Sequence, residues 1–241
     1  MKPEVHFSWI KDVTYKEAWD LQTDLLKGLV AEKLSEEGRK LKAEGRYHQH
    51  HRLLFCEHSP VFTLGKSGSM EHLLLTETQL SDGGIEFFKI NRGGDITYHG
   101  PGQITGYPIF DLEEFFTDVH KYVESLEESV IRLMAEFGLK GIRIPGYTGV
   151  WMEPDSSSEK YRKICAIGVH MSRWVTMHGF AFNVNTDLDY FDKIVPCGIA
   201  DDNKTVTSMA KELGQELDYK KTGQMLAETM AKVFGFTLIT V

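Results

Sequence analysis

The chain has 241 residues, of which 41% are hydrophobic and 26% are charged, an ordinary composition for a folded globular protein. Its 27 lysines and arginines against 35 aspartates and glutamates give a net charge of −8, which disfavours nucleic-acid binding because that binding needs cations to neutralise phosphates. No apolar run approaches the roughly 18 residues that span a bilayer, and the first residues lack a secretory signal pattern. We expect a cytoplasmic protein with no membrane segment and no nucleic-acid partner.

Two stretches carry clear helical patterns. Thr14 and Glu17 have the spacing of a capping box and precede apolar residues at helical intervals, which predicts a first helix that begins near residue 15. Further along, apolar residues recur every three or four positions and predict a helix over 113–137. Asp111 can cap this helix at its start and Gly138 can end it.

Short apolar or alternating runs bounded by glycine, proline or polar residues predict strands that together form a mixed sheet. These runs cover 53–57, 61–64, 87–91, 104–110, 150–152, 163–171 and 175–185. Weaker helical patterns follow over 205–213 and 220–234, and 155–159 reads as a polar loop. Without a repeat, a low-complexity tract or a Pro-rich linker, we expect one domain over residues 1–241.

A glycine-rich segment at 92–103 directly follows an apolar run. Glycine suits backbone that must turn tightly or lie close to a ligand, and here Arg92, Thr97, His99 and Gln103 stand between the glycines. We interpret the segment as one wall of a binding site; a plain hairpin connection is the alternative. Neither phosphate-binding glycine pattern, G-x-x-x-x-G-K-[ST] or G-x-G-x-x-G, occurs in it.

The chain has three cysteines, and Cys197 is the candidate nucleophile among them. It lies between a proline and a glycine, a setting typical of an exposed thiol, whereas Cys56 and Cys165 stand in apolar runs where a thiol behaves as a small hydrophobic group. The odd number and the absence of C-x-x-C spacing argue against a disulfide framework and a zinc site. Because a thiol attacks as its thiolate, a nearby cation is needed, and Lys163 is one candidate. A solvated lysine at a strand start remains the alternative.

Two histidine-containing segments allow more than one interpretation. His178 and Gly179 open a strand in which small and apolar residues alternate, which fits either a slot for an aliphatic chain or ordinary sheet packing. Three histidines in the run 48–51 raise the possibility of a non-catalytic metal-binding module. On a strand or loop, however, these side chains would point in different directions, so we favour a solvated histidine run and expect no bound metal.

The motifs at 92–103, 163–168, 178–179, 183–185 and 196–198, in this order, resemble those of the lipoyl(octanoyl) transferases of bacterial lipoate biosynthesis. The resemblance begins at 57–65 and extends almost to the C-terminus. It implies a mixed α/β fold with one larger and one smaller sheet, like that of biotin- and lipoate-protein ligases. It also implies transfer of octanoate from acyl carrier protein through an enzyme cysteine to a lysine of a lipoyl carrier domain, without ATP or another cofactor.

The resemblance also assigns roles to residues. Cys197 would be the acyl-thioester nucleophile, and Lys163 would lower its pKa and move protons. Supporting positions would be His178, Asn183 and Gln103. Acceptors would be lipoyl domains of 2-oxoacid dehydrogenases and the glycine cleavage H protein. The acyl pocket would be lined by Arg92, Gly93, Gly94, Asp95, Ile96, Thr97, Tyr98, His99, Ala166, Ile167, Gly168, Gly179, Phe180 and Ala181.

Two features depart from the family pattern or extend it. Lys66 replaces the usual arginine, and Cys165 stands where alanine is common; strict strand alternation would put Cys165 on the same face as Lys163. Docking an acidic carrier on a chain of charge −8 would need a basic rim. Its candidate residues are Lys66, Arg143, Lys160, Arg162 and Arg173.

Two alternative activities remain: an octanoyl amidotransferase acting between carrier domains, and an ATP-dependent lipoate-protein ligase.

Overall fold

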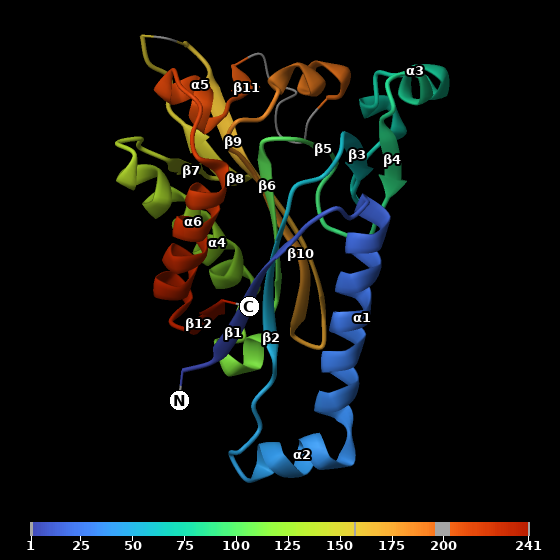
Figure 1. Cartoon of the computed structure of the whole chain (residues 1–241), viewed down its shortest axis with the longest axis vertical. Helices are drawn as coiled ribbons and strands as arrows, with labels where there is room; N and C mark the ends of the chain where they lie inside the picture. The colour runs from blue at the N-terminus through green and yellow to red at the C-terminus, as the bar shows by residue number, and fades with distance from the viewer. Residues whose placement is uncertain (1, 157, 196–202, 241) are drawn as a thin grey trace.

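The computed structural model describes residues 2–156, 158–195 and 203–240 (Figure 1). Within them, the larger sheet has nine strands in the order β12-β1-β2-β6-β10-β9-β8-β7, with β11 pairing β9. The bounds are β1 Glu4–Ile10, β2 His51–Cys56, β6 Gln103–Ile109, β7 Ile142–Ile144, β8 Tyr147–Met152, β9 Tyr161–Ser172, β10 Val175–Asn183, β11 Lys204–Val206 and β12 Thr237–Thr240. The long strands β9 and β10 form an antiparallel hairpin near the middle of this sheet.

A smaller sheet of three strands lies beside it, in the order β4-β3-β5. Its strands are β3 Val61–Leu64, β4 Glu86–Lys89 and β5 Ile96–His99. Strand β3 runs parallel to β4 and antiparallel to β5. Because β5 belongs to the glycine-rich segment, this sheet carries that segment to strand β9 of the larger sheet.

Helices cover both faces of the larger sheet. Helix α1, Tyr15–Leu34, packs against β10 and β6, whereas α4, Val119–Glu136, and α6, Tyr219–Phe234, pack against each other, with α4 also contacting β8 and β9 (Figure 1). Shorter helices are α2 Glu36–Ala43, α3 Glu77–Asp82 and α5 Met209–Leu213, with 3-10 turns at η1 Met70–His72, η2 Leu112–Glu114 and η3 Leu188–Lys193.

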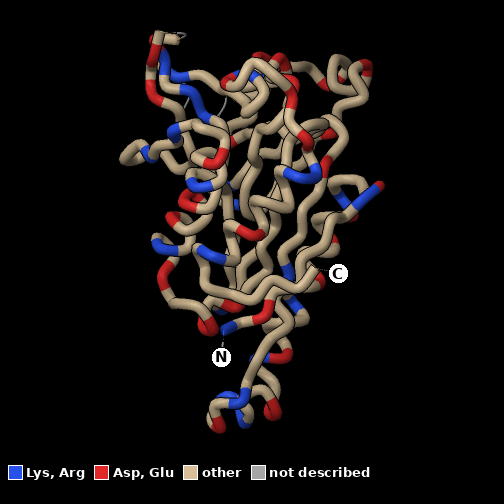
Figure 2. The backbone as a smooth tube through the Cα atoms, turned by 60° about the vertical axis from the view of Figure 1, so that its left-hand side comes forward, with Lys and Arg blue, Asp and Glu red and all other residues tan. Residues whose placement is uncertain are grey.

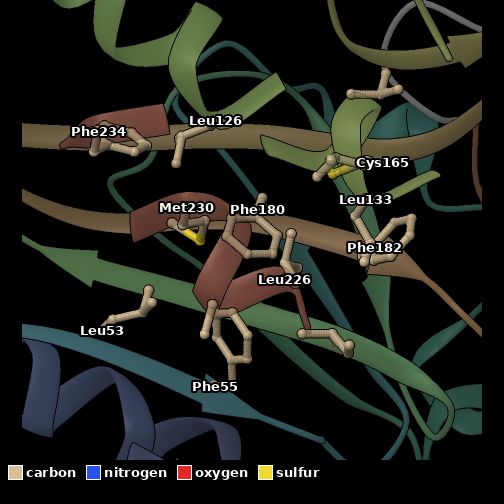
Figure 3. Close-up of a cluster of buried hydrophobic side chains, with 14 of the residues drawn as sticks. Leu53, Phe55, Leu126, Leu133, Cys165, Phe180, Phe182, Leu226, Met230 and Phe234 are labelled. Atoms are coloured by element: carbon tan, nitrogen blue, oxygen red, sulfur yellow. The ribbon is translucent and has the colours of Figure 1, made fainter. Parts of the chain in front are cut away.

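The main hydrophobic core lies between the sheet and the α4–α6 pair. Phe55, Phe180 and Phe182 from the sheet meet Leu126 and Met230 from the helices, and all are buried (Figure 3). A second cluster fills the space between α1 and the opposite face of the sheet. Burying an apolar side chain of this size contributes about 1.5–3 kcal/mol, so these two clusters hold the helices against the sheet.

The predicted mixed α/β fold with a larger and a smaller sheet is confirmed, as is the start of the first helix at its Thr14 capping box. The predicted helix over 113–137 is shorter at its start, because α4 begins at Val119 and is capped by Asp118. Asp111 instead caps the 3-10 turn η2 by accepting a hydrogen bond from the backbone N–H of Glu113 at 3.1 Å. Apolar periodicity continued through this turn, which is why it read as helix.

All seven predicted strands are present, with small shifts at their ends. Strands β1, β5, β7, β11 and β12 were not predicted. Strand β5 was hidden by its glycine-rich surroundings. Strands β1 and β12 are parallel neighbours from opposite ends of the chain, and such a pairing leaves no local pattern of turn residues.

Candidate active site

A cavity of about 420 Å³ lies beside the β9–β10 hairpin. In the register of this hairpin Gly168 lies opposite Gly179 and Ala166 opposite Ala181, and all four residues line the cavity. A Cβ atom at Gly168 would lie 2.9 Å from the carbonyl oxygen of Gly93, so a larger residue there would collide with the glycine-rich loop. The absence of large side chains on this part of the hairpin creates the space, whose volume is within the roughly 300–1,000 Å³ of small-molecule sites.

The glycine-rich loop forms a wall of the cavity. It crosses the edge of β9, where the backbone N–H of Gly93 donates to the carbonyl of Val169 at 3.0 Å. The buried guanidinium of Arg92 donates from Nη2 to the Thr63 carbonyl at 2.6 Å and to Thr63 Oγ1 at 3.0 Å. Gly94 has φ +83°, in the region that favours glycine. The charge of Arg92 therefore fastens the loop to β3.

The predicted pocket residues fall into two groups. Those that line the cavity are Arg92, Gly93, Gly94, Asp95, Ile96, Thr97, His99, Ala166, Ile167, Gly168, Gly179, Phe180 and Ala181, together with Lys163 and His178. Tyr98 is instead fully buried under the smaller sheet, where its ring stacks on that of Tyr190 with centroids 4.5 Å apart. Gln103 and Asn183 lie outside the lining and act through hydrogen bonds.

A buried hydrogen-bond network connects the cavity wall to β9. Gln103 is its centre: its Oε1 lies 2.9 Å from His99 Nδ1, and its Nε2 donates to Asn183 Oδ1 at 2.9 Å. Asn183 Nδ2 donates to the carbonyl of Thr207 at 2.9 Å, and the Thr207 N–H donates to the carbonyl of Lys163 at 2.9 Å. This geometry places the His99 proton on Nδ1 and couples the wall to the backbone of Lys163.

Lys163 lies at the cavity with only 8% of its surface exposed. Its Nζ is 4.5 Å from the centre of the buried Trp151 ring, a distance typical of a cation–π contact. A solvated lysine at a strand start, the alternative left open by the sequence, is therefore wrong. The amine is positioned inside the site.

Cys165 does not share a face with Lys163, contrary to the expectation from strict alternation. Val150 pairs with Cys165 but the next residue, Trp151, pairs with Lys163, so Ile164 is an extra residue in β9. A bulge of this kind breaks alternation, and it turns Cys165 into the main core (Figure 3). Burial there raises the pKa of the Cys165 thiol far above its ordinary value.

Neutral histidines and tyrosines form the inner end of the site. His58 Nε2 lies 2.6 Å from the hydroxyl of Tyr107, and the ring of Tyr15 stacks on His99 with centroids 5.8 Å apart. Burial lowers the pKa of His58 to about 4 and that of His178 to about 3, and burial also lowers the pKa of His99. These imidazoles are uncharged near neutral pH, so the inner end suits a neutral group.

Sequence reasoning missed Tyr15, Thr63, Thr105 and Tyr107 as neighbours of the site. Tyr15 opens α1 and Tyr107 lies in β6, and neither position carries a motif. Only the 57–65 run, noted as part of the family resemblance, contained a signal for Thr63.

The predicted nucleophile, Cys197, lies outside the described residues. The chain on either side is anchored at the site: Val195 donates its N–H to the carbonyl of His72 at 2.8 Å, and Asn203 accepts from the N–H of Tyr161 at 2.9 Å. Beyond Asn203, Val206 lines the cavity and pairs with Lys163. The first anchor is connected to the cavity wall by the contact of His72 with Asp95, and the second belongs to β9, which lines the cavity.

The other two thiols are buried within the described part of the chain. Burial raises the pKa of Cys56 to about 12, and its Sγ lies 3.8 Å from His58 Nδ1. Both Cys56 and Cys165 therefore remain protonated at neutral pH, and neither is a good nucleophile.

The histidine run does not converge on one point. His51 is fully buried in β2 and accepts a hydrogen bond from the Asp111 N–H at 3.2 Å, whereas His50 faces the ring of His6. Across residues 2–156, 158–195 and 203–240, no three histidine, cysteine or carboxylate side chains are grouped as metal ligands. In the same ranges no helix is both long and apolar enough to cross a bilayer.

The prediction that Arg162 belongs to a basic docking rim is wrong. Its guanidinium is 3% exposed and forms ion pairs with Glu212 at 2.8 Å and Asp155 at 2.6 Å. Arg143 is likewise paired, with Glu127 and Glu128. Acidic and basic residues are interspersed along the fold (Figure 2). Arg162 serves internal ion pairs instead of a docking surface, whereas Arg143 is 38% exposed and stays a candidate for the rim.

The sequence of this chain is similar to a known protein family and to several known proteins. A profile of the lipoyl protein ligase A/B catalytic domain matches residues 14–231. The chain is 50% identical over 222 residues to an octanoyltransferase of Cytophaga hutchinsonii, covering 92% of this chain and 89% of the relative. It is 51% identical over 234 residues to an octanoyltransferase of Christiangramia forsetii, covering 96% of this chain and 95% of the relative.

Solved structures with low sequence identity share the fold. A bi-partite lipoate protein ligase from Thermoplasma acidophilum matches with a TM-score of 0.67 and 14% identity, covering 100% of this chain and 88% of that one. A biotin protein ligase from Aquifex aeolicus matches with a TM-score of 0.52 and 11% identity, covering 95% and 70%. From the profile match and the close relatives, the chain belongs to the lipoyl protein ligase A/B catalytic domain family.

Proposed function

We propose that this protein is an octanoyltransferase that moves an octanoyl group from acyl carrier protein to a lysine of a lipoyl carrier domain, through a thioester on Cys197. Curated relatives that are about half identical over nearly the whole chain carry the name octanoyltransferase. The acceptors are lipoyl domains of 2-oxoacid dehydrogenases and the glycine cleavage H protein, and residues 1–241 act as one catalytic domain. The reaction needs no cofactor.

The observation that carries the proposal is the cavity itself. Its floor of glycine and alanine leaves room for an aliphatic chain, and Lys163 lines the same cavity. An acyl chain bound there gains about 0.8 kcal/mol for each buried methylene. The fixed amine then stands beside the end of the chain that reacts.

The thiol chemistry points to Cys197 by elimination. Burial keeps the thiols of Cys56 and Cys165 protonated, which leaves Cys197 as the remaining sulfur nucleophile in the sequence. Its neighbours in the chain, Val195 and Asn203, are anchored next to the cavity. A cation such as Lys163 beside the thiol favours its thiolate.

In the first half-reaction the Cys197 thiolate attacks the carbonyl carbon of the octanoyl thioester, and the bond from that carbon to the carrier sulfur breaks. The carrier thiolate leaves and takes up a proton. In the second half-reaction the amine of the acceptor lysine attacks the acyl carbon, an amide bond forms, and Cys197 leaves as a thiolate. The proton lost by the attacking amine passes to Lys163 when that group is neutral. No bond to a nucleotide is made or broken.

The test is covalent capture. Incubation with octanoyl-acyl carrier protein, in the absence of an acceptor, should add one octanoyl group, and peptide mapping should find it on Cys197. Cys197→Ser should carry no adduct, whereas Cys165→Ala and Cys56→Ala serve as matched controls that keep it. An adduct confined to Cys165 or Cys56 would overturn the site.

The same experiment separates the alternative activities. A ligase would label the acceptor only with free octanoate and ATP, and an amidotransferase would take octanoate from an octanoylated carrier domain in place of the acyl carrier protein. Lys163→Met should slow acylation and raise the pKa read from the pH profile of Cys197 alkylation. An unchanged pH profile would remove that role from Lys163.

A further inference from the structure

His72 links two parts of the site that are distant in the sequence. It is the last residue of the 3-10 turn η1, which is capped by Ser69, and its side chain is about one-third exposed. The Nδ1 atom of His72 forms a short contact with the carboxylate of Asp95, a residue of the cavity wall. Nothing in the acyl-transfer steps above uses this pair.

Asp95 is held firmly in the wall. Its Oδ1 accepts a hydrogen bond from the N–H of Ile96 at 2.7 Å, and its carbonyl accepts one from the N–H of Gly65 at 3.1 Å. A Cβ atom at Gly68 would lie 2.5 Å from Oδ1, so the loop after β3 packs directly on the carboxylate. The other oxygen of this carboxylate, Oδ2, contacts His72. The side chain of His72 is therefore fixed to a rigid partner.

The backbone of His72 forms a hydrogen bond with a second segment. Its carbonyl accepts the N–H of Val195 at 2.8 Å, and next to this bond Leu74 N–H donates to the carbonyl of Lys193 at 3.0 Å. Leu73 and Ile194 form an antiparallel bridge between these two bonds. The chain at 193–195 is therefore laid along 72–74, and Cys197 follows Val195 by two residues.

We propose that His72 is a positioning residue for acyl transfer. Its side chain is fixed to the cavity wall through Asp95, and its carbonyl fixes Val195, so that the chain leading to Cys197 starts from a point that is tied to the cavity wall. This inference rests on the proposed function. It assigns His72 no contact with substrate and no proton transfer.

The physical reason is the sensitivity of nucleophilic attack to geometry. A displacement of about 1 Å in a reacting group can cost about a hundredfold in rate. Loss of the His72–Asp95 pair would free η1, and with it the 193–195 segment that is bonded to it. The acyl chain would still bind, because the small-residue floor and Arg92 are untouched. The expected change is thus in the rate at saturating donor and not in the KM.

The experiment measures single-turnover octanoylation of Cys197 by intact mass, over a range of octanoyl-acyl carrier protein concentrations. His72→Leu should lower the maximal rate by about ten- to a hundredfold with little change in the concentration for half-maximal rate. His72→Asn should restore most of the rate, because its amide nitrogen occupies the position of Nδ1 and can donate to Asp95.

A matched control is His48→Leu, since His48 is another exposed histidine beside a carboxylate, 3.6 Å from Glu114 and outside the cavity lining. It should acylate like the unmodified protein. If His72→Leu does not fold, Asp95→Ala removes the acceptor of the same pair and should also lower the maximal rate. Wild-type rates in His72→Leu or, where that variant does not fold, in Asp95→Ala would overturn the inference, as would a loss in His72→Leu that His72→Asn does not restore. Absence of any adduct in the unmodified protein would overturn the proposed function instead.

Discussion

Enlarging Ala181 should shorten the acyl chain that the protein prefers. Ala181 is buried in β10, lines the cavity and lies opposite Ala166 across the β9–β10 hairpin. Leucine at this position adds three carbon atoms to the floor. If these atoms occupy the space of the acyl chain, the bound octanoyl group loses the burial of as many methylenes.

The size of the effect follows from the burial energy. At about 0.8 kcal/mol per methylene, the loss for octanoyl is about 2.4 kcal/mol, or about 60-fold in kcat/KM. A hexanoyl group is two methylenes shorter and loses at most about 0.8 kcal/mol, or about fourfold. The ratio of hexanoyl to octanoyl transfer should therefore rise about 15-fold in Ala181→Leu.

The assay compares kcat/KM for carriers loaded with hexanoyl and octanoyl groups, with Ala181→Ser as the control of nearly unchanged volume. Urea unfolding of each variant verifies that the fold is retained. Equal losses for the two chain lengths would refute the reasoning, because a defect that ignores chain length does not arise from displaced methylenes. Unchanged octanoyl transfer would place the acyl chain elsewhere.

Two further predictions concern stability. Burial lowers the pKa of His58 to about 4 and that of His178 to about 3. The free energy of unfolding that these neutral imidazoles contribute is therefore full above pH 6.5. It is lost as the pH falls toward these values, because the unfolded chain binds the protons first. Each histidine should lower the free energy of unfolding by about 2 kcal/mol between pH 7 and pH 5. His58→Gln should make the free energy of unfolding, measured by urea titration, depend less on pH, and an unchanged slope would contradict the prediction. Lys33→Met removes the buried cation 2.9 Å from Asp111 and should lower the free energy of unfolding by about 3 kcal/mol. Adding Asp111→Asn should recover part of that loss, and strictly additive losses would argue against the pair.

Much of the fold was readable from the sequence because its signals are local. The capping box at Thr14 fixed the start of α1, and apolar periodicity located α4 and α6. The family resemblance of the motifs at 163–168 and 178–179 predicted that Gly168, Gly179 and Ala181 line a pocket, and all three line the cavity. These features depend on residues within a few positions of one another.

Tertiary structure decided the features that depend on register and on distant partners. One extra residue at Ile164 separates Lys163 from Cys165, and no pattern along β9 announces it. The burial of Arg162 between Glu212 and Asp155 likewise needs three segments to meet. Sequence alone determined which chemical groups are available and which stretches become helix or strand, because these follow from local periodicity. Only the folded chain determined which groups face the cavity, because facing depends on strand pairing and burial between segments far apart in the sequence.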